Sequence, residues 1–220
     1  MVDKLQVAVI TGSHPYDVIN FQNMFKNYPD INIYLQHMED FVTDTGNGKD
    51  FYDVILFYHM ITETPGYEDN DFNQKMEQVL NNLGERGEGL FILHHSLVAF
   101  PEWETWSQIC GVENRINDEV YEGVEMNLQI KNDSHYITDG LKSWKMIDEI
   151  YTIPDADKTN KNNILLTTDH EKSMKTIAWT RTYKKSRVFC LASGHDNRAF
   201  SNTCFKKVVK RGIEWTGRVE

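Results

Sequence analysis

The chain of 220 residues carries 23 Lys and Arg against 33 Asp and Glu, so its formal net charge is −10 with neutral histidines. This acidic balance argues against binding to nucleic acid, because the phosphate backbone requires a concentrated basic surface. Apolar stretches such as 54–61 are far shorter than the roughly 18 residues that a helix needs to span a membrane, so no membrane partner is expected.

In the first hundred residues, strand-like and helix-like segments alternate. Short runs rich in Val, Ile and Leu predict strands at 6–10, 31–35, 54–58 and 90–93. Apolar side chains at helical spacing predict helices at 18–28 and 69–83, and Pro101 marks the start of another. This alternation indicates βαβ crossovers and a mostly parallel sheet.

The second half of the chain has a different pattern. Apolar and polar residues alternate from Val124 to Ile130, as in a strand with one exposed face. Further strands are predicted at 146–153, 164–167, 176–180 and 187–192, followed by a helix at 201–215. Successive strands without intervening helices indicate antiparallel additions to the parallel core. Since no repeat or linker-like stretch is present, we expect a single domain over residues 1–220.

The three cysteines indicate a cellular compartment rather than a chemical role. They are odd in number and have no C-x-x-C spacing, which is typical of reduced thiols. The chain also begins without the apolar core of a signal peptide. We therefore expect a cytoplasmic protein.

Histidines follow four of the predicted strands. They are His14 after the first, His59 after the third, His94 and His95 after the fourth, and His195 after the strand at 187–192. The carboxyl ends of parallel strands meet at one edge of a sheet, where ligands bind in open α/β folds. We therefore expect these five imidazoles at a common edge, where they suit proton transfer or metal ligation.

The last three of these histidines are the main catalytic candidates. His94 and His95 point to opposite sides if the strand continues, so only one is expected to face the edge. Gly194 permits a close approach of the backbone to a ligand, and Asp196 is placed to orient the ring of His195. For His14 and His59, a turn cap and a packed core position are the structural alternatives.

The residues around the histidine pair favour no nucleophile and no nucleotide cofactor. Ser96 stands where a nucleophile elbow would place its serine, but His94 and Val98 are not the small neighbours that an elbow needs. We expect the Ser96 hydroxyl to bind substrate or to cap a turn. Residues 11–14 lack the spacing of a glycine-rich phosphate loop.

A second group of residues has the composition of a sugar-binding site. Glu149 lies on a predicted strand, and Trp179 is followed two residues later by Arg181. An aromatic face stacks on a sugar ring while charged groups hold its hydroxyls. The alternative is a core tryptophan and a surface ion pair.

Several segments resemble the ThuA-like (trehalose utilisation) family. Residues 87–95 and then 100–103 resemble its pattern G-G-G-L-V-x-I/L-H-S/H … F-x-x-W. The other matching segments are 133–141, 148–151, 178–181 and 188–196. Their order and spacing agree from Thr11 to Trp215.

The resemblance implies the fold of class I glutamine amidotransferases, a flavodoxin-like three-layer α/β fold with helices on both faces of the sheet. In true amidotransferases a cysteine follows the strand that ends here at His94, and this chain has none there, so no glutaminase activity is expected. His195 resembles the triad histidine in position. His94 takes the place of the family's histidine and His95 that of the following serine.

The family resemblance implies a carbohydrate-processing enzyme that acts on a sugar or keto-sugar derivative. We expect His94 or His95 to exchange protons with substrate together with His195, and Asp196 to orient His195. The residues expected to bind substrate are His14, His59, Ser96, Glu149, Trp179 and Arg181.

Two other classes of function stay open. One is a metal-dependent hydrolase in which several of the histidines bind a divalent ion such as zinc. The other is a non-catalytic sugar-binding or regulatory protein. In each case the expected partner is a small carbohydrate, and association of the chain with its own copies stays open.

Overall fold

One nine-stranded sheet organises the part of the chain that the computed structural model describes, residues 4–26, 28–46 and 48–220. Its strand order is β2-β1-β3-β4-β9-β8-β7-β5-β6. The parallel strands are β1 (Leu5–Gly12), β2 (Ile31–His37), β3 (Val54–His59), β4 (Gly89–Leu93) and β9 (Ser186–Leu191). The sheet therefore contains the mostly parallel core that the sequence predicts.

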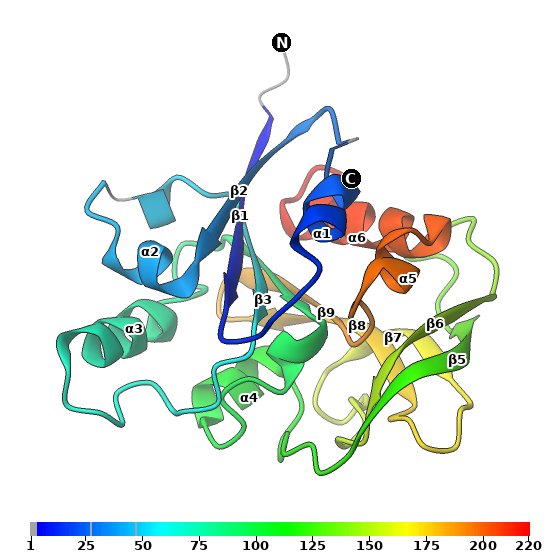
Figure 1. Ribbon diagram of the computed structural model, residues 1–220. Helices are drawn as coiled ribbons and strands as arrows, with labels where there is room; N and C mark the ends of the chain where they lie inside the picture. The colour runs from blue at the N-terminus through cyan, green and yellow to red at the C-terminus, as the bar shows by residue number, and fades with distance from the viewer. Residues whose placement is uncertain (1–3, 27, 47) are drawn as a thin grey trace.

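The remaining strands extend this core in antiparallel fashion. They are β5 (Val120–Ile130), β6 (Trp144–Tyr151), β7 (Asn163–Thr168) and β8 (Thr176–Tyr183). Figure 1 shows β5 and β6 on the opposite side of the molecule from β1 and β2. The antiparallel second half is thus confirmed.

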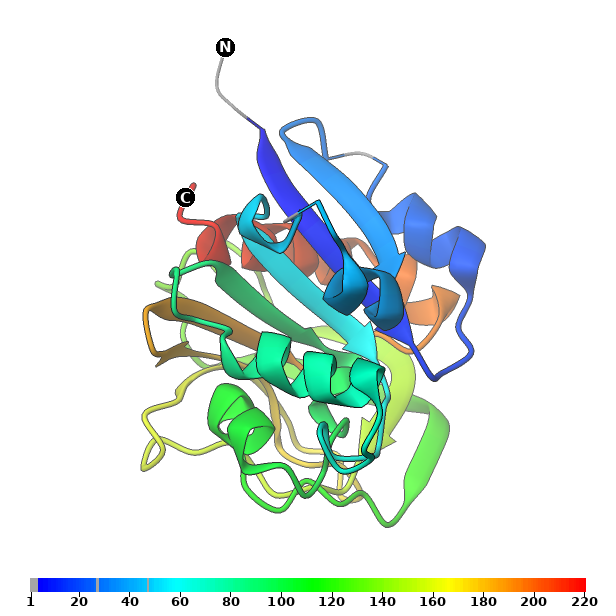
Figure 2. The ribbon, with the colours of Figure 1, turned by 90° about the vertical axis from the view of Figure 1, so that its left-hand side faces the viewer.

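Helices cover both faces of the sheet. On one face lie α1 (Val18–Met24), α5 (Asn197–Phe200) and α6 (Thr203–Thr216). On the other lie α2 (Met38–Thr43), α3 (Asp71–Asn81) and α4 (Glu104–Cys110). Figure 2 shows α3 and α4 in front of the sheet with α6 behind it. Two short 3-10 turns, η1 (Gly48–Asp50) and η2 (His94–Leu97), complete the elements. No helix among them is long and apolar enough to cross a membrane.

The alternation of side chains along each strand divides the core into two layers. Val7 and Val9 of β1 pack under α1 and α6, whereas Ala8 and Ile10 pack under α2 and α3. Because both faces are covered, the central parallel strands β3 and β4 are buried along their whole length. This burial fixes the register of the strands and, with it, the places where their carboxyl ends stop.

A buried arginine fixes the segment that follows η2. Arg115 has no exposed surface, and its guanidinium donates to the main-chain oxygens of Leu97 at 2.7 Å, Ala99 at 2.6 Å and Phe100 at 2.7 Å. Its fork of donors suits several carbonyls at once. The backbone immediately after the histidine pair is therefore held rigidly.

Candidate active site

The expected gathering of histidines occurs at the carboxyl edge of the parallel strands. His59 ends β3, His94 directly follows β4, and His195 lies in the loop after β9. Since β3, β4 and β9 are neighbours and run in parallel, their ends reach the same edge. The topology therefore brings together residues that are far apart in the sequence.

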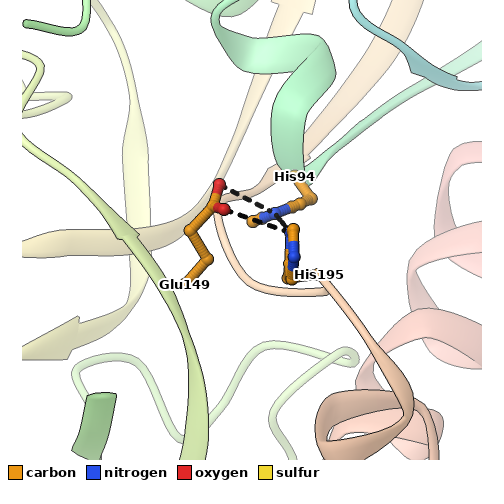
Figure 3. Close-up of side chains that lie close together, drawn as sticks. All are labelled: His94, Glu149 and His195. Atoms are coloured by element: carbon orange, nitrogen blue, oxygen red, sulfur yellow. Dashed lines mark hydrogen bonds and ion pairs between the residues drawn. The ribbon is translucent and has the colours of Figure 1, made fainter. Parts of the chain in front are cut away.

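Three side chains from three separate segments form the centre of the site (Figure 3). Nε2 of His94 lies 3.3 Å from Nδ1 of His195. The carboxylate of Glu149, on β6, reaches both rings, with Oε1 3.5 Å from His94 Nε2 and Oε2 3.2 Å from His195 Nδ1. We call this group the histidine–glutamate cluster.

The cluster is mostly shielded from solvent but open on one side. The side chain of His94 has no exposed surface and that of Glu149 is 7% exposed, whereas that of His195 is 19% exposed. A ligand can therefore approach the cluster past the ring of His195.

The ring of His94 is held by a strained turn and a main-chain acceptor. His94 has a φ of 50°, in the left-handed region that residues other than glycine seldom adopt. This strand-to-helix turn resembles the geometry of a nucleophile elbow, with an imidazole in the place of the nucleophile. Nδ1 of the same ring donates to the Ala192 oxygen at 2.8 Å, which fixes its orientation.

The electrostatics of the cluster favour positive charge on the imidazole of His94. Burial alone would lower the pKa of His94, but the hydrogen bond that its ring donates to Glu149 and the charges of Asp148 and Glu149 raise it above its ordinary value. Burial would likewise raise the pKa of Glu149, and the contact and charge of His94 bring it below the ordinary value.

Asp148 supports the loop that carries His195. Its carboxylate accepts the main-chain N–H groups of Gly194 at 2.7 Å and of His195 at 2.9 Å, as well as that of Glu149 at 2.9 Å. Burial raises the pKa of Asp148, against the lowering effect of His94 and these donors. Asp148 therefore fixes the backbone of the loop on β6.

Two tyrosines complete the surroundings, and sequence reasoning did not select them. The Tyr151 hydroxyl lies 3.0 Å from His94 Nε2, and the two rings stack with centroids 5.0 Å apart. The Tyr58 hydroxyl donates to the Gly194 oxygen at 2.9 Å. For Tyr151 a signal existed: it stands two residues after Glu149, so the two share a face of the strand.

His95 turns away from the cluster into a stack of rings. Its centroid lies 4.4 Å from that of His14 and 4.1 Å from that of Tyr58, and it is 1% exposed. Burial, with the charges of His94 and His14, lowers the pKa of His95 to about 2. Of the histidine pair, His94 is the member that contacts His195 and Glu149, while His14 stands edge-on to His195 with centroids 6.1 Å apart.

His59 and Ser96 have structural roles in the core. The ring of His59 is fully buried against Phe100 and Trp106, and burial lowers its pKa to about 3. The Ser96 hydroxyl accepts the main-chain N–H of His59 at 2.7 Å and donates to its oxygen at 2.8 Å. These placements match the structural alternatives for both residues, and neither side chain is available to a substrate.

The expectation that the Trp179 ring stacks on a sugar is wrong, whereas the contact expected between the half-buried Arg181 and a ligand stays a prediction. Trp179 has no exposed surface, and its indole N–H donates to the Cys110 oxygen at 2.8 Å. A ring without exposed surface cannot stack on a ligand. Arg181 donates to the main-chain oxygens of Gln108 and of Ile109 at the end of α4. Both residues thus attach α4 to the sheet.

The orienting role expected of Asp196 belongs to Glu149 instead. The Asp196 carboxylate caps α5 by accepting the N–H of Arg198 at 2.7 Å, and it also pairs with the guanidinium of that residue. Among the described residues, Glu149 is the carboxylate that contacts the His195 ring. Sequence reasoning gave Glu149 the role of holding substrate.

Comparisons with known proteins agree on the family and the fold. The model of one family, ThuA, described as trehalose utilisation, matches residues 18–216. A ThuA-like protein from Parabacteroides merdae has a similar structure, with a TM-score of 0.72 and 18% identity, over 98% of this chain and 90% of that one. No curated protein matches the sequence.

Two other solved structures share the fold at low sequence identity. A cytoplasmic protein from Salmonella typhimurium LT2 has a TM-score of 0.72 and 13% identity, over 96% of this chain and 99% of that one. A glutamine amidotransferase from Thermotoga maritima has a TM-score of 0.56 and 9% identity, over 97% of this chain and 98% of that one. The flavodoxin-like amidotransferase-type fold expected from the sequence is confirmed.

Proposed function

The chain belongs to the ThuA family, described as trehalose utilisation, and from this premise we propose that it is a carbohydrate-processing enzyme with the histidine–glutamate cluster as its reaction centre. Its substrate is a sugar or a keto-sugar derivative. The observation that carries the proposal is the Glu149 carboxylate, which lies within 3.5 Å of His94 and within 3.2 Å of His195 at the carboxyl edge of the sheet.

The geometry of the cluster supports chemistry at a carbonyl-bearing sugar. A nearly buried carboxylate between two imidazoles stabilises a positive charge there, because few water molecules screen the interaction. Such a charge at His94, whether a proton or a metal ion, stabilises the negative oxygen that forms when the His195 ring takes a proton from the carbon next to a carbonyl. The partly exposed ring of His195 places this charge within reach of a ligand.

The same position argues for an activity other than glutamine hydrolysis. In the glutamine amidotransferases that the chain resembles, a nucleophilic cysteine follows the strand equivalent to β4. This chain has His94 at that position, and the side chain of His94 is part of the cluster. The three cysteines lie elsewhere, on α4, β9 and α6. We therefore propose that the centre has no glutaminase activity.

The test is turnover of trehalose, of its 3-keto derivative and of other keto-disaccharides by the wild type and by His195→Ala. We expect a fall of at least about 100-fold in kcat/KM for the variant, as is usual when an acid–base group or its equivalent is removed. His170→Ala, which removes a histidine from a turn outside the cluster, serves as the control and should keep the wild-type rate.

Two outcomes contradict this function. Equal turnover rates for the wild type and His195→Ala would show that the cluster takes no part in the reaction. Thermal stabilisation of the wild type by these sugars without any turnover would favour the non-catalytic sugar-binding alternative.

A further inference from the structure

We propose that the histidine–glutamate cluster binds a divalent transition metal ion of the zinc class. The ligands are Nε2 of His94, Nδ1 of His195 and the Glu149 carboxylate, whose ligand atoms all lie within 4.8 Å of one another. This inference rests on the proposed reaction centre and identifies the positive charge that the centre holds.

The first argument is the tautomer of His94. Its Nδ1 lies 2.8 Å from the Ala192 carbonyl oxygen, which can only accept a hydrogen bond, so Nδ1 carries the ring proton. In the neutral ring, Nε2 then presents a lone pair to the cluster. Oε1 of Glu149, another electron-rich atom, lies 3.5 Å away. Two such atoms repel each other in a site that excludes water unless a positive charge, either a proton on Nε2 or a metal ion, lies between them.

The second argument is the set of distances among the three ligand groups. Zinc bonds of about 2.0–2.1 Å in tetrahedral geometry place neighbouring ligand atoms about 3.3–3.4 Å apart. The two imidazole nitrogens are 3.3 Å apart, Oε1 of Glu149 lies 3.5 Å from His94 Nε2, and the other oxygen, Oε2, lies 3.2 Å from His195 Nδ1. Three separate segments thus hold each carboxylate oxygen about one tetrahedral edge from one imidazole nitrogen, with a set of three ligand atoms within 4.8 Å of one another, so a small shift of the carboxylate suffices to enclose one ion.

The third argument is that the surroundings fix the ligands in advance. Histidines that bind metals usually donate their other ring N–H to a carbonyl or a carboxylate, and Ala192 provides that acceptor for His94. The main-chain N–H of His195 is held by Asp148 at 2.9 Å. Little ordering remains to be done when the ion binds, which favours affinity.

The ligand set also points to a catalytic rather than a purely structural ion. Catalytic zinc sites commonly have three protein ligands and one open position, and two histidines with one glutamate form such a set. The side of the cluster at His195, the most exposed ligand, leaves room for this position. A bound ion would there polarise the carbonyl oxygen of a keto-sugar or activate a water molecule.

The experiment measures metal binding directly in untagged protein. The protein is stripped with a chelator and then titrated with Zn²⁺ against a chromophoric chelator, and with Co²⁺ while the visible absorption of tetrahedral cobalt is recorded. We expect one ion per chain for the wild type. Glu149→Gln and His195→Ala should each weaken binding by at least about 100-fold and abolish the cobalt spectrum.

Two control variants separate ligation from general damage. His14→Ala removes a neighbouring imidazole outside the ligand set, and Tyr151→Phe removes the hydroxyl near His94 while it retains the stacked ring. Both should keep one ion per chain. Circular dichroism establishes that each variant is folded, and variants at the fully buried His94 are not needed.

Equal zinc affinity in the wild type, Glu149→Gln and His195→Ala would overturn the metal site, and so would the absence of stoichiometric binding to the wild type. These failures are separate from failure of the proposed function. Full turnover of keto-disaccharides by metal-free protein would support the proposed reaction centre but show that the reaction needs no metal ion. If the protein binds one ion per chain but turns over no sugar, the metal site is supported and the proposed carbohydrate reaction is contradicted.

Discussion

Oε2 of Glu149 lies 3.2 Å from Nδ1 of His195, while the other oxygen of the same carboxylate reaches His94. Glu149 comes from β6, in the antiparallel half of the sheet, and the two histidines follow parallel strands. The contact therefore joins the two halves of the fold at the histidine–glutamate cluster. Both the charge and the length of the Glu149 side chain are needed to make it.

Shortening this side chain should disable the centre. In Glu149→Asp the carboxylate is withdrawn by one methylene, so it cannot contact both rings. Since a displacement of about 1 Å in a catalytic site can cost about 100-fold in rate, we expect a loss of that order in kcat/KM for keto-disaccharides. Glu125→Asp, at an exposed ion pair with Lys145 on the same β5–β6 hairpin, is the control. A wild-type rate in Glu149→Asp would contradict the role of this contact.

Asp148→Asn should loosen the loop that carries His195. Oδ2 of Asp148 accepts the main-chain N–H of Gly194 at 2.7 Å. In the variant the NH2 group of asparagine would take its place, so two hydrogen-bond donors would face each other. We expect a loss of about 2–3 kcal/mol in the free energy of unfolding, measured with urea. Hydrogen exchange at the amide of Gly194 should also become faster. Asp133→Asn, at an exposed position, should change neither measurement.

The backbone at Gly194 should tolerate no side chain. Its φ is +127°, and an added Cβ would lie 3.0 Å from Cζ of Phe205 and 3.3 Å from Cδ1 of Leu93. Gly194→Ala should therefore cost about 2–4 kcal/mol of unfolding free energy, from strain and overpacking together. Gly140→Ala also has a positive φ but open space around it, and should cost about 1 kcal/mol. Equal losses in the two variants would show that packing on Phe205 is unimportant.

His59 should make the fold less stable in mild acid. Burial lowers its pKa to about 3 in the folded chain, from 6.5 in the unfolded chain. Below pH 6.5 the unfolded state thus binds a proton that the folded state excludes, so stability present above that pH is lost as the pH falls. Between pH 7.5 and pH 5 this amounts to about 2 kcal/mol.

The variant His59→Phe isolates this effect. Phenylalanine fits the aromatic surroundings of Phe100 and Trp106 and does not titrate. Urea unfolding at pH 7.5 and pH 5 should show a smaller decrease in stability for the variant than for the wild type, by about 2 kcal/mol. His170→Ala, in a turn away from this core, should decrease like the wild type. Parallel decreases in the wild type and His59→Phe would contradict the prediction.

The sequence was sufficient to predict the fold and the meeting of the central histidines. Hydrophobic periodicity marked each strand, and parallel topology then required that His94 and His195 lie at the same edge. The short helices α2 and α5 were not predicted, because six and four residues contain too few turns for a helical pattern to emerge. To predict that Glu149 lies beside both rings, one must also know where β6 runs in the sheet. The alternation of residues along one strand does not specify this.

The residues that were assigned wrongly share a physical cause. Trp179 has the chemistry of a sugar-binding side chain, yet it is fully buried and its indole N–H is bonded to the end of α4. Asp196 stands next to His195 in the sequence, but the start of α5 takes its carboxylate as a cap. Burial and local capping depend on the tertiary fold, so residue type and spacing alone do not separate a ligand contact from a structural one.

The separation of 101 positions between His94 and His195 has a consequence for biosynthesis. A nascent chain acquires β1 to β4 early, but β9 must be synthesised and inserted beside β4 before the second imidazole arrives. Pairings between such distant segments close late, since the loop between them has to be ordered first. The histidine–glutamate cluster therefore forms only after β9 has been synthesised and paired with β4.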